Sequence, residues 1–261
     1  MTDRTDARGT TTTAIAEPEG RDPFDRLRAS TPARVFLGRC GTALPTRALL
    51  EFQLAHARAR DAVHDEFEPG RMASLLPSHD VRIVHSRALD RQTYLQRPDL
   101  GRRLDDPSAA SLVREDYEAV FVIADGLSAR AVHEHAAATL AATLPKIVGW
   151  RLGPYIVSCR ARVALGDEIG ERLGAQLAVV LIGERPGLSA PDSLGAYLTW
   201  QPRVGRRDSE RNCISNIRPP AGLSYEQAAS RLAWLMNTAR RLRLSGVALK
   251  EESGPLALGN M

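Results

Sequence analysis

The amino-acid sequence predicts an α/β fold in which a doubly wound, mainly parallel, Rossmann-like sheet follows a smaller helical N-terminal region. The main observation is the unbroken apolar run 177–182, which is closed by Gly183 and is typical of a strand buried on both faces. An earlier run of the same kind, 119–124, is ended by Asp125-Gly126. Helical patterns alternate with these runs, and that alternation favours a parallel sheet with right-handed crossovers.

The stretch between the two apolar runs supplies the rest of a βαβαβ unit. Ser128 is expected to cap a helix with apolar residues at helical spacing: Val132, Ala136, Leu140 and Leu144. A third strand begins at Tyr155 and is expected to run to about Val163. A short helix over 167–173 then leads into the strand at 177–182.

Beyond the central strand the pattern is less regular. Residues 192–200 predict a short helix or a strand, and 212–217 a further strand. Ser224 and the glutamine three positions later form a capping box, so we expect a helix from there to about Leu244. Residues 247–249 are interpreted as a last edge strand.

The chain before the sheet is predicted to be helical and irregular. Thr46 is a suitable N-cap for a helix that ends near His64. The turn at 97–103 brings several arginines together. These guanidinium groups could hold a phosphate or a partner's carboxylates, or they could be solvated or paired within an interface. The sequence leaves both interpretations open.

These patterns divide the chain into four parts. Residues 1–22 contain almost nothing to bury and are predicted to be a disordered tail. Residues 23–110 form the helical N-terminal region, and residues 111–252 form the Rossmann-like domain. Residues 253–261 are a C-terminal tail.

Composition excludes several classes of protein. With 261 residues, 43% hydrophobic and 25% charged, the chain resembles an ordinary soluble globular protein. The net charge is only +4, and acidic residues are interleaved with the basic ones, so we expect no nucleic-acid partner. The odd number of cysteines, three, argues against a disulfide framework. No secretory signal or membrane span is expected, which predicts a cytoplasmic protein.

Candidate functional residues follow the central strand. Glu184 and Arg185 come directly after it, where open α/β sheets bind their ligands. The alternative is a solvated salt bridge in a turn. No dinucleotide fingerprint, Walker A loop, nucleophile elbow or zinc-spaced cysteine pair is present. His133 and His135 lie on different helix faces and cannot chelate one metal together. We therefore expect a binding subunit with no catalytic or metal-ligating residue of its own.

Several separated motifs carry a family resemblance, and they occur in this order: Thr31-Pro-Ala-Arg-Val, Arg97-Pro-Asp-Leu-Gly-Arg-Arg-Leu, Asp125-Gly-Leu-Ser, Gly183-Glu-Arg-Pro-Gly-Leu and Cys213-Ile-Ser-Asn-Ile. From about Ala29 to Leu249 the chain resembles the small (light) subunit of ethanolamine ammonia-lyase. The resemblance implies a lyase that converts ethanolamine to acetaldehyde and ammonia by adenosylcobalamin radical chemistry. The cofactor would perform that chemistry while the protein binds, orients and shields it.

The resemblance also implies partners and a location. The family's large subunit, a TIM barrel, holds ethanolamine, and the small subunit covers the cobalamin at the shared interface in an assembly of six of each subunit. A cytoplasmic location follows, with enclosure in a bacterial microcompartment left open. The alternative function is a non-catalytic interaction or regulatory α/β domain that has lost the cofactor.

Three cofactor contacts of the family fall on Val163, Glu184 and Cys213 in this sequence. Glu184 could accept hydrogen bonds from the amide side chains of the corrin ring. Val163 could offer an apolar surface or a backbone group to the edge of the corrin. Cys213 could be a small packing contact, and its alternative is a buried structural cysteine.

Overall fold

The computed structural model describes residues 24–31, 33–77 and 80–250. The predicted tails, 1–22 and 253–261, lie outside these residues. The chain divides into two compact units, Met1–Leu50 and Glu51–Met261. In the first unit, the short helix α1 (Asp25–Ala29) is followed by an irregular segment, and the rings of Phe24 and Phe36 stack with centroids 4.3 Å apart. Helix α2 (Thr46–His64) ends at the predicted residue, and Thr46 is its first residue instead of its N-cap.

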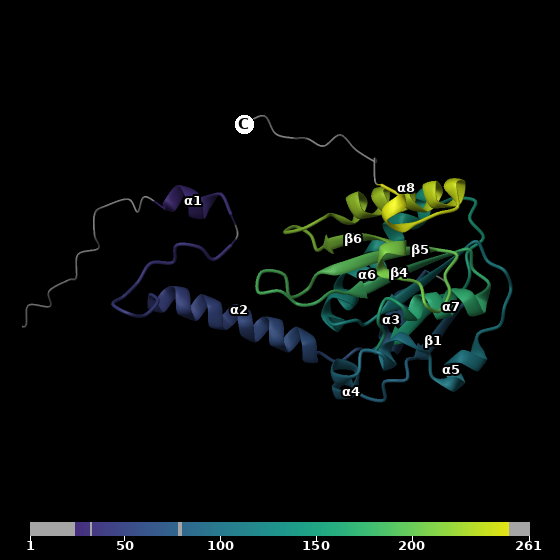
Figure 1. Ribbon diagram of the computed structural model, residues 1–261, viewed down its shortest axis with the longest axis horizontal. Helices are drawn as coiled ribbons and strands as arrows, with labels where there is room; N and C mark the ends of the chain where they lie inside the picture. The colour runs from purple at the N-terminus through teal and green to yellow at the C-terminus, as the bar shows by residue number, and fades with distance from the viewer. Residues whose placement is uncertain (1–23, 32, 78–79, 251–261) are drawn as a thin grey trace, which may run out of the picture. The chain divides into compact units, whose positions relative to one another are not determined.

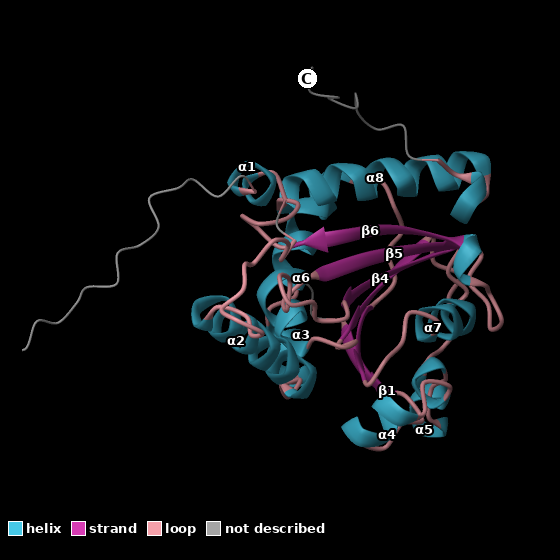
Figure 2. Ribbon diagram, turned by 60° about the vertical axis from the view of Figure 1, so that its left-hand side comes forward, coloured by secondary structure: helices cyan, strands magenta, loops and turns pink. Residues whose placement is uncertain are grey.

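The second unit contains a six-stranded sheet with the order β1-β3-β2-β4-β5-β6 (Figures 1 and 2). The strands are β1 (Val81–His85), β2 (Ala119–Ala124), β3 (Tyr155–Cys159), β4 (Leu177–Gly183), β5 (Leu194–Trp200) and β6 (Arg211–Ile217). The first four in this order pair in parallel, whereas β5 and β6 pair antiparallel. The α/β class is confirmed, but the sheet is mixed. The connection 184–193 contains no helix, so β5 returns directly beside β4 instead of crossing over.

Helices cover both faces of this sheet (Figures 1 and 2). They are α3 (Pro69–Ser74), α4 (Arg91–Gln96), α5 (Asp106–Ser111), α6 (Ala129–Thr143), α7 (Leu165–Leu173) and α8 (Tyr225–Leu242), with short 3-10 turns η1 (Leu100–Arg102), η2 (Leu144–Lys146), η3 (Asp208–Glu210) and η4 (Gly246–Ala248). Helices α6 and α8 pack on one face with Phe121 and Ile123 of β2. Helix α7 packs on the other face with Val120 and Val122. The run 177–182 is buried on both faces, as predicted.

Strand β1 was not predicted from the sequence. It lies within 23–110 and pairs with β3 at one edge of the sheet. Its sequence, Val-Arg-Ile-Val-His, contains no continuous apolar run. In the structure only Val84 of this strand is fully buried, so the other positions can be polar. The stretch interpreted as a helical N-terminal region therefore contributes a strand to the sheet.

Several predicted boundaries need correction. Strand β3 ends at Cys159 instead of near Val163, because Arg160 adopts a positive φ of 55° that breaks the extended backbone. Residues 247–249 do not form an edge strand; 246–248 form the 3-10 turn η4, which begins at Gly246 with φ 81°. Residues 192–200 resolve into strand β5. The capping box at Ser224 is confirmed, and its helix ends at Leu242.

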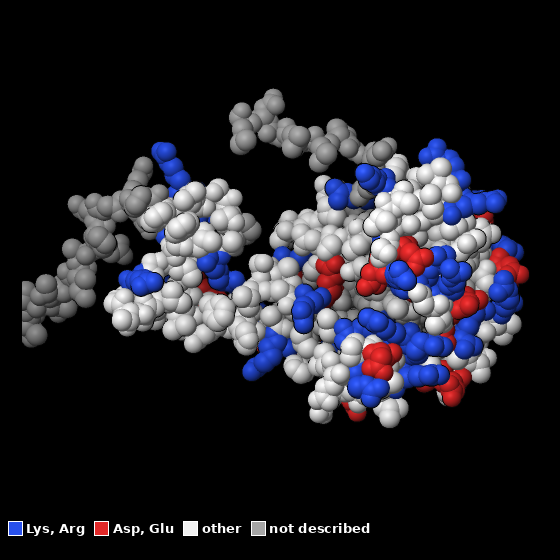
Figure 3. Space-filling model, viewed as in Figure 1, with Lys and Arg blue, Asp and Glu red and all other residues white. Residues whose placement is uncertain are grey.

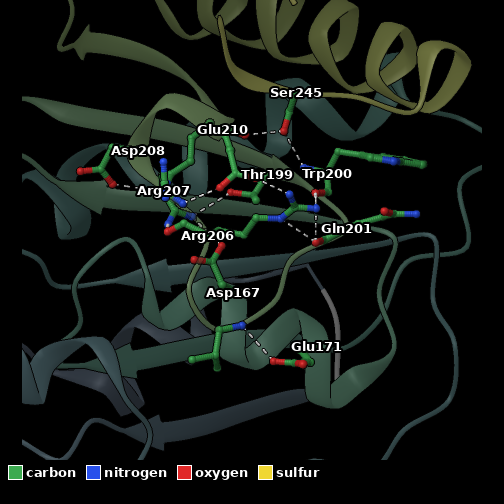
Figure 4. A network of polar contacts seen from close by, with 12 residues as sticks. Asp167, Glu171, Thr199, Trp200, Gln201, Arg206, Arg207, Asp208, Glu210 and Ser245 are labelled. Atoms are coloured by element: carbon green, nitrogen blue, oxygen red, sulfur yellow. Dashed lines mark hydrogen bonds and ion pairs between the residues drawn. The ribbon is translucent and has the colours of Figure 1, made fainter. Parts of the chain in front are cut away.

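A polar network fixes the turn between β5 and β6 (Figure 4). Arg211, the first residue of β6, donates to the Asp167 carboxylate of α7 at 2.5 Å and to the Thr199 hydroxyl at 3.1 Å. The side chains of Arg211 and Asp167 are each only 2% exposed. Arg206 holds the same turn by pairing with Glu210. The network ties α7 to the antiparallel part of the sheet.

On the face shown in Figure 3, basic and acidic side chains are interspersed over the second unit and do not gather by sign. Within the described part of the chain, no helix is both long and apolar enough to cross a membrane.

Candidate functional site

The candidate site lies where the parallel strands β2, β3 and β4 end. The loop after β2 leads to α6 on one face of the sheet, and the loop after β3 leads to α7 on the other face. Because β2 and β3 are neighbours, their loops diverge and leave a crevice between them. Open α/β sheets bind ligands at this kind of topological switch point.

A cavity of about 440 Å³ occupies this crevice. Its volume falls within the range of about 300–1,000 Å³ that is usual for small-molecule sites. The ends of all three strands contribute to its lining, which consists of Tyr94, Gly126, Leu127, Arg162, Val163, Ile182, Gly183, Glu184, Arg185 and Tyr197. The structure thus brings Val163 and Glu184 together around one cavity.

Close backbone packing builds the cavity wall between β2 and β4. A Cβ atom on Gly183 would lie 2.0 Å from the carbonyl oxygen of Ser128, so only glycine fits there. The buried Asp125 carboxylate accepts hydrogen bonds from the amides of Gly126 and Ala161, each at 2.9 Å, and so ties the β2 loop to the β3 loop. Burial raises the pKa of Asp125.

Glu184 is half-buried, and its carboxylate accepts hydrogen bonds from neutral groups. The donors are the hydroxyls of Ser193 and Ser215, the latter at 2.6 Å, and the backbone amide of Asn216 at 3.3 Å. Arg185 is exposed, and within the described residues it forms no ion pair with Glu184. The arrangement is therefore a carboxylate positioned by hydroxyls and an amide, and not the turn salt bridge of the alternative interpretation.

Cys213 lies beside the cavity and does not line it. It is opposite Tyr197 in the register of β5 and β6, and it is exposed, so the alternative of a buried structural cysteine is not supported. Removal from water raises the pKa of the Tyr197 phenol, and the neighbouring Cys213 and Glu184 raise it further. Tyr197, which lines the cavity with Glu184, therefore lies opposite Cys213 on the neighbouring strand. A Cβ atom on Gly195 would lie 2.8 Å from Glu184 Oε1, so this glycine leaves room for the carboxylate.

Sequence reasoning missed four residues of this site: Tyr94, Arg162, Gly195 and Tyr197. The Arg162 guanidinium lies over the Tyr94 ring, 4.3 Å from its centroid, and donates to the Tyr94 carbonyl at 3.1 Å. Its Nε atom is buried and has no hydrogen-bond partner among the described residues. Arg162 could have been identified from the sequence because it directly precedes Val163. Tyr94 lies on helix α4, which is distant in sequence from the other residues of the site.

The arginine cluster at 97–103 is mostly paired within the chain. Arg97 pairs with Asp99 at 2.8 Å, and Arg103 pairs with Glu168 of α7 at 2.8 Å. Two opposing effects act on Glu168: burial raises its pKa, whereas hydrogen bonds from Arg103 and the Leu104 amide lower it, and the net result is a lowered pKa. These contacts favour the interpretation of paired arginines over that of a phosphate site.

Taken together, the fold and cavity define an α/β domain with a candidate ligand site at the carboxyl ends of its parallel strands. Residues 21–250 match the family model described as "Ethanolamine ammonia-lyase light chain (EutC)". The chain therefore belongs to the family of ethanolamine ammonia-lyase small (light) subunits.

Curated relatives carry the same description. An ethanolamine ammonia-lyase small subunit from Xanthomonas campestris pv. campestris (strain B100) is 54% identical over 92% of this chain and 91% of its own length. One from Ralstonia nicotianae is 50% identical over 95% of this chain and 93% of its own length. A third, from Bradyrhizobium diazoefficiens, is 53% identical over 91% of this chain and 94% of its own length.

Proposed function

We propose that this chain binds adenosylcobalamin together with a large subunit, and that the complex converts ethanolamine to acetaldehyde and ammonia. The observation that carries the proposal is the cavity in which Val163 and Glu184, expected from the family to contact the cofactor, face the same space. The name of the relatives implies a large subunit as the partner. An assembly of six subunits of each kind and a Rossmann-like cofactor domain are parts of the same proposal.

The size of the cavity supports a shared site. Adenosylcobalamin is larger than a space of about 440 Å³, so this chain would cover only one edge of the corrin. The rest of the cofactor would then lie against the large subunit. A shared site of this kind explains why the chain carries a binding cavity but does not itself need to hold ethanolamine.

Three polar groups of the cavity suit the edge of a corrin. Its amide side chains offer N–H donors, which the Glu184 carboxylate can accept in addition to the hydroxyls that position it. Their carbonyl oxygens can accept from Arg162, whose Nε atom has no partner among the described residues. Val163 supplies an apolar surface in the same lining, and Cys213 lies beside Tyr197 on the neighbouring strand.

When bound, the cofactor supplies the radical chemistry, and the protein supplies binding, orientation and shielding. In this chain Glu184 and Arg162 would hold the cofactor's edge in one orientation. Asp125 would keep the two loops at the cavity wall in register. The apolar residues of the lining would keep water away from the buried edge. The proposed location is cytoplasmic, with enclosure in a microcompartment left open.

A reconstitution experiment tests the proposal. Adenosylcobalamin is titrated into the purified chain, into the large subunit and into the mixture, with visible absorbance and acetaldehyde formation as readouts. We expect full binding and activity only in the mixture, and none in the isolated chain. Acetaldehyde formation by this chain alone, or full cofactor affinity in the large subunit alone, would contradict the proposal. An intact complex that binds no cofactor would indicate an interaction domain that has lost its ligand.

A further inference from the structure

The region behind the cavity contains a buried histidine with an unused nitrogen. His135 lies on α6, and its side chain is 7% exposed. Its Nδ1 atom is 3.0 Å from the hydroxyl of Tyr225, at the start of α8. Its Nε2 atom is buried and makes no hydrogen bond with any described group. Buried polar atoms are nearly always paired, so this nitrogen is available to a partner from outside the chain, such as an ion or a water molecule.

Two carboxylates face this nitrogen. Glu134 Oε2 lies 3.8 Å from His135 Nε2, and one ligand atom each from Glu134, His135 and Asp192 fall within 4.8 Å of one another. Asp192 belongs to the connection between β4 and β5, so the cluster joins elements that are distant in sequence. The sequence shows no metal-ligand spacing for this reason. We refer to Glu134, His135 and Asp192 as the His135 cluster.

An arginine donates to one oxygen atom of each carboxylate. Arg130 donates to Glu134 Oε1 at 2.9 Å, which leaves Oε2 turned toward His135. Arg218 donates to Asp192 Oδ1 at 2.6 Å. Partners of this kind fix the orientation of metal ligands in known metal sites. Tyr225 plays the same part for the imidazole, because an Nδ1–H bond to its hydroxyl leaves the Nε2 lone pair free for a metal.

We propose that the His135 cluster binds a divalent transition-metal cation of the zinc type through one imidazole nitrogen and two carboxylate oxygens. Zinc sites commonly combine these ligand types and complete their coordination with water. Two carboxylates and a neutral imidazole balance the charge of the cation.

The geometry requires only a small adjustment. Metal–ligand bonds of about 2.1 Å place ligand atoms roughly 3.4 Å apart around a tetrahedral zinc ion. The observed separations are 3.8 Å and at most 4.8 Å, so the two carboxylates must move inward by about 1 Å. Both can do so, because the Glu134 side chain is 41% exposed and that of Asp192 is 23% exposed. Their exposed side also gives the cation a path of entry.

The position of this site suggests what it does. Asp192 precedes Ser193, whose hydroxyl donates to Glu184 in the cofactor cavity. A cation shared by α6 and Asp192 would therefore fasten the connection 184–193 to the helix layer behind it. The proposal is independent of the cofactor, because metal binding by the His135 cluster requires only this chain.

The test is calorimetric titration of the full-length chain with Zn²⁺, after treatment with a chelator and without cobalamin. We expect one site in the wild type and a rise in its melting temperature on saturation. His133→Ala is the matched control, because this histidine lies on the same helix and its Nε2 already accepts from the Glu68 amide at 3.2 Å. It should leave the affinity unchanged. Tyr225→Phe should weaken binding by about 10- to 100-fold, as loss of an outer partner does.

His135→Ala should weaken zinc binding by more than Tyr225→Phe does. Glu134→Gln and Asp192→Asn should each weaken zinc binding as well. Because they alter carboxylates at the surface, they test the proposal even if His135→Ala fails to fold. Equal zinc affinity in the wild type, Glu134→Gln and Asp192→Asn would overturn the proposal. So would the absence of any site in the wild type, which would mean that a water molecule satisfies His135.

Discussion

Two carboxylates at different ends of the sheet are held in opposite ways. Asp167 lies under the turn between β5 and β6, is almost fully buried and pairs with the guanidinium of Arg211. Glu184 lies at the carboxyl ends of the parallel strands, lines a cavity and is held by two hydroxyls and an amide. The first carboxylate has its charge neutralised within the chain, and the second does not.

The difference separates an end of the sheet that is fixed by a buried ion pair from the end that carries the candidate site. A buried ion pair leaves no hydrogen-bonding capacity for a ligand, but its removal leaves an uncompensated charge. A carboxylate held by neutral donors keeps its charge and has room for further donors, since its two oxygens can accept about four hydrogen bonds. Substitutions at the two ends should therefore affect different properties, stability at one and ligand affinity at the other.

The largest effect is expected at the buried pair. Arg211→Met leaves Asp167 charged and unpaired, and it should lower the free energy of unfolding by about 3–5 kcal/mol in urea denaturation. The double variant Asp167→Leu/Arg211→Met is the control, because it removes both charges and should recover much of the loss. A loss below about 1 kcal/mol in Arg211→Met would mean that the pair is not a structural element.

A smaller effect is expected from Gly195→Ala at the end that carries the candidate site. The added Cβ would lie 2.8 Å from Glu184 Oε1 and displace the carboxylate. We expect cofactor affinity in the reconstituted complex to weaken about tenfold, equivalent to about 1.4 kcal/mol. Gly187→Ala in the following loop is the matched control, since its nearest neighbours lie 3.9 Å away. Equal affinities in the two variants would show that Glu184 tolerates displacement.

Glu168 provides a pH test of the ion pairs on α7. Its folded-state pKa lies below the ordinary value of 4.5, so its stabilising contribution is fully present above pH 4.5 and is lost as the pH falls through the lowered pKa. The free energy of unfolding should then decline with a slope from this group of at most about 1.4 kcal/mol per pH unit. Denaturant titrations at pH values from about 3 to about 6 measure this slope, because this range covers roughly the pH values at which Glu168 changes its protonation. In Glu168→Gln the decline should be shallower; an identical slope would remove Glu168 as its source.

The smallest effect is expected at Arg185, next to Glu184. It is exposed and makes no ion pair with Glu184, so Arg185→Gln should change stability by no more than about 0.5 kcal/mol. Thermal denaturation of the isolated chain provides the measurement. A destabilisation of more than about 1 kcal/mol would restore the turn salt bridge as an explanation of this motif.

The parallel core could be predicted from the sequence because its signals are local. The runs that form β2 and β4 are continuous and apolar, and the caps at Ser128 and Ser224 mark the starts of α6 and α8. Strand β1 could not be predicted, because it is an edge strand with polar residues and pairs with a partner about 70 positions later. The antiparallel direction of β5 likewise depends on a connection that contains no helix.

The candidate site was only partly predictable for the same reason. Glu184 directly follows a strong strand signal, and the family resemblance indicates Val163. Tyr94 and Arg162 meet only through tertiary packing, and so does the contact between Gly195 and Glu184. Cys213 lies opposite Tyr197 on the neighbouring strand and is not part of the cavity lining, a distinction that no sequence motif contains.

The most direct test of the account is adenosylcobalamin titration of the complex carrying Glu184→Gln. The amide keeps the shape but replaces half of the acceptor with a donor, and a hydrogen bond to a charged group is worth about 1.5–3 kcal/mol. We therefore expect cofactor affinity to weaken by roughly one to two decades while subunit association and stability are retained. Glu115→Gln, an exposed glutamate just before β2, is the control and should bind like the wild type. Unchanged affinity for Glu184→Gln in an intact complex would contradict the assignment of Glu184 to the cofactor site.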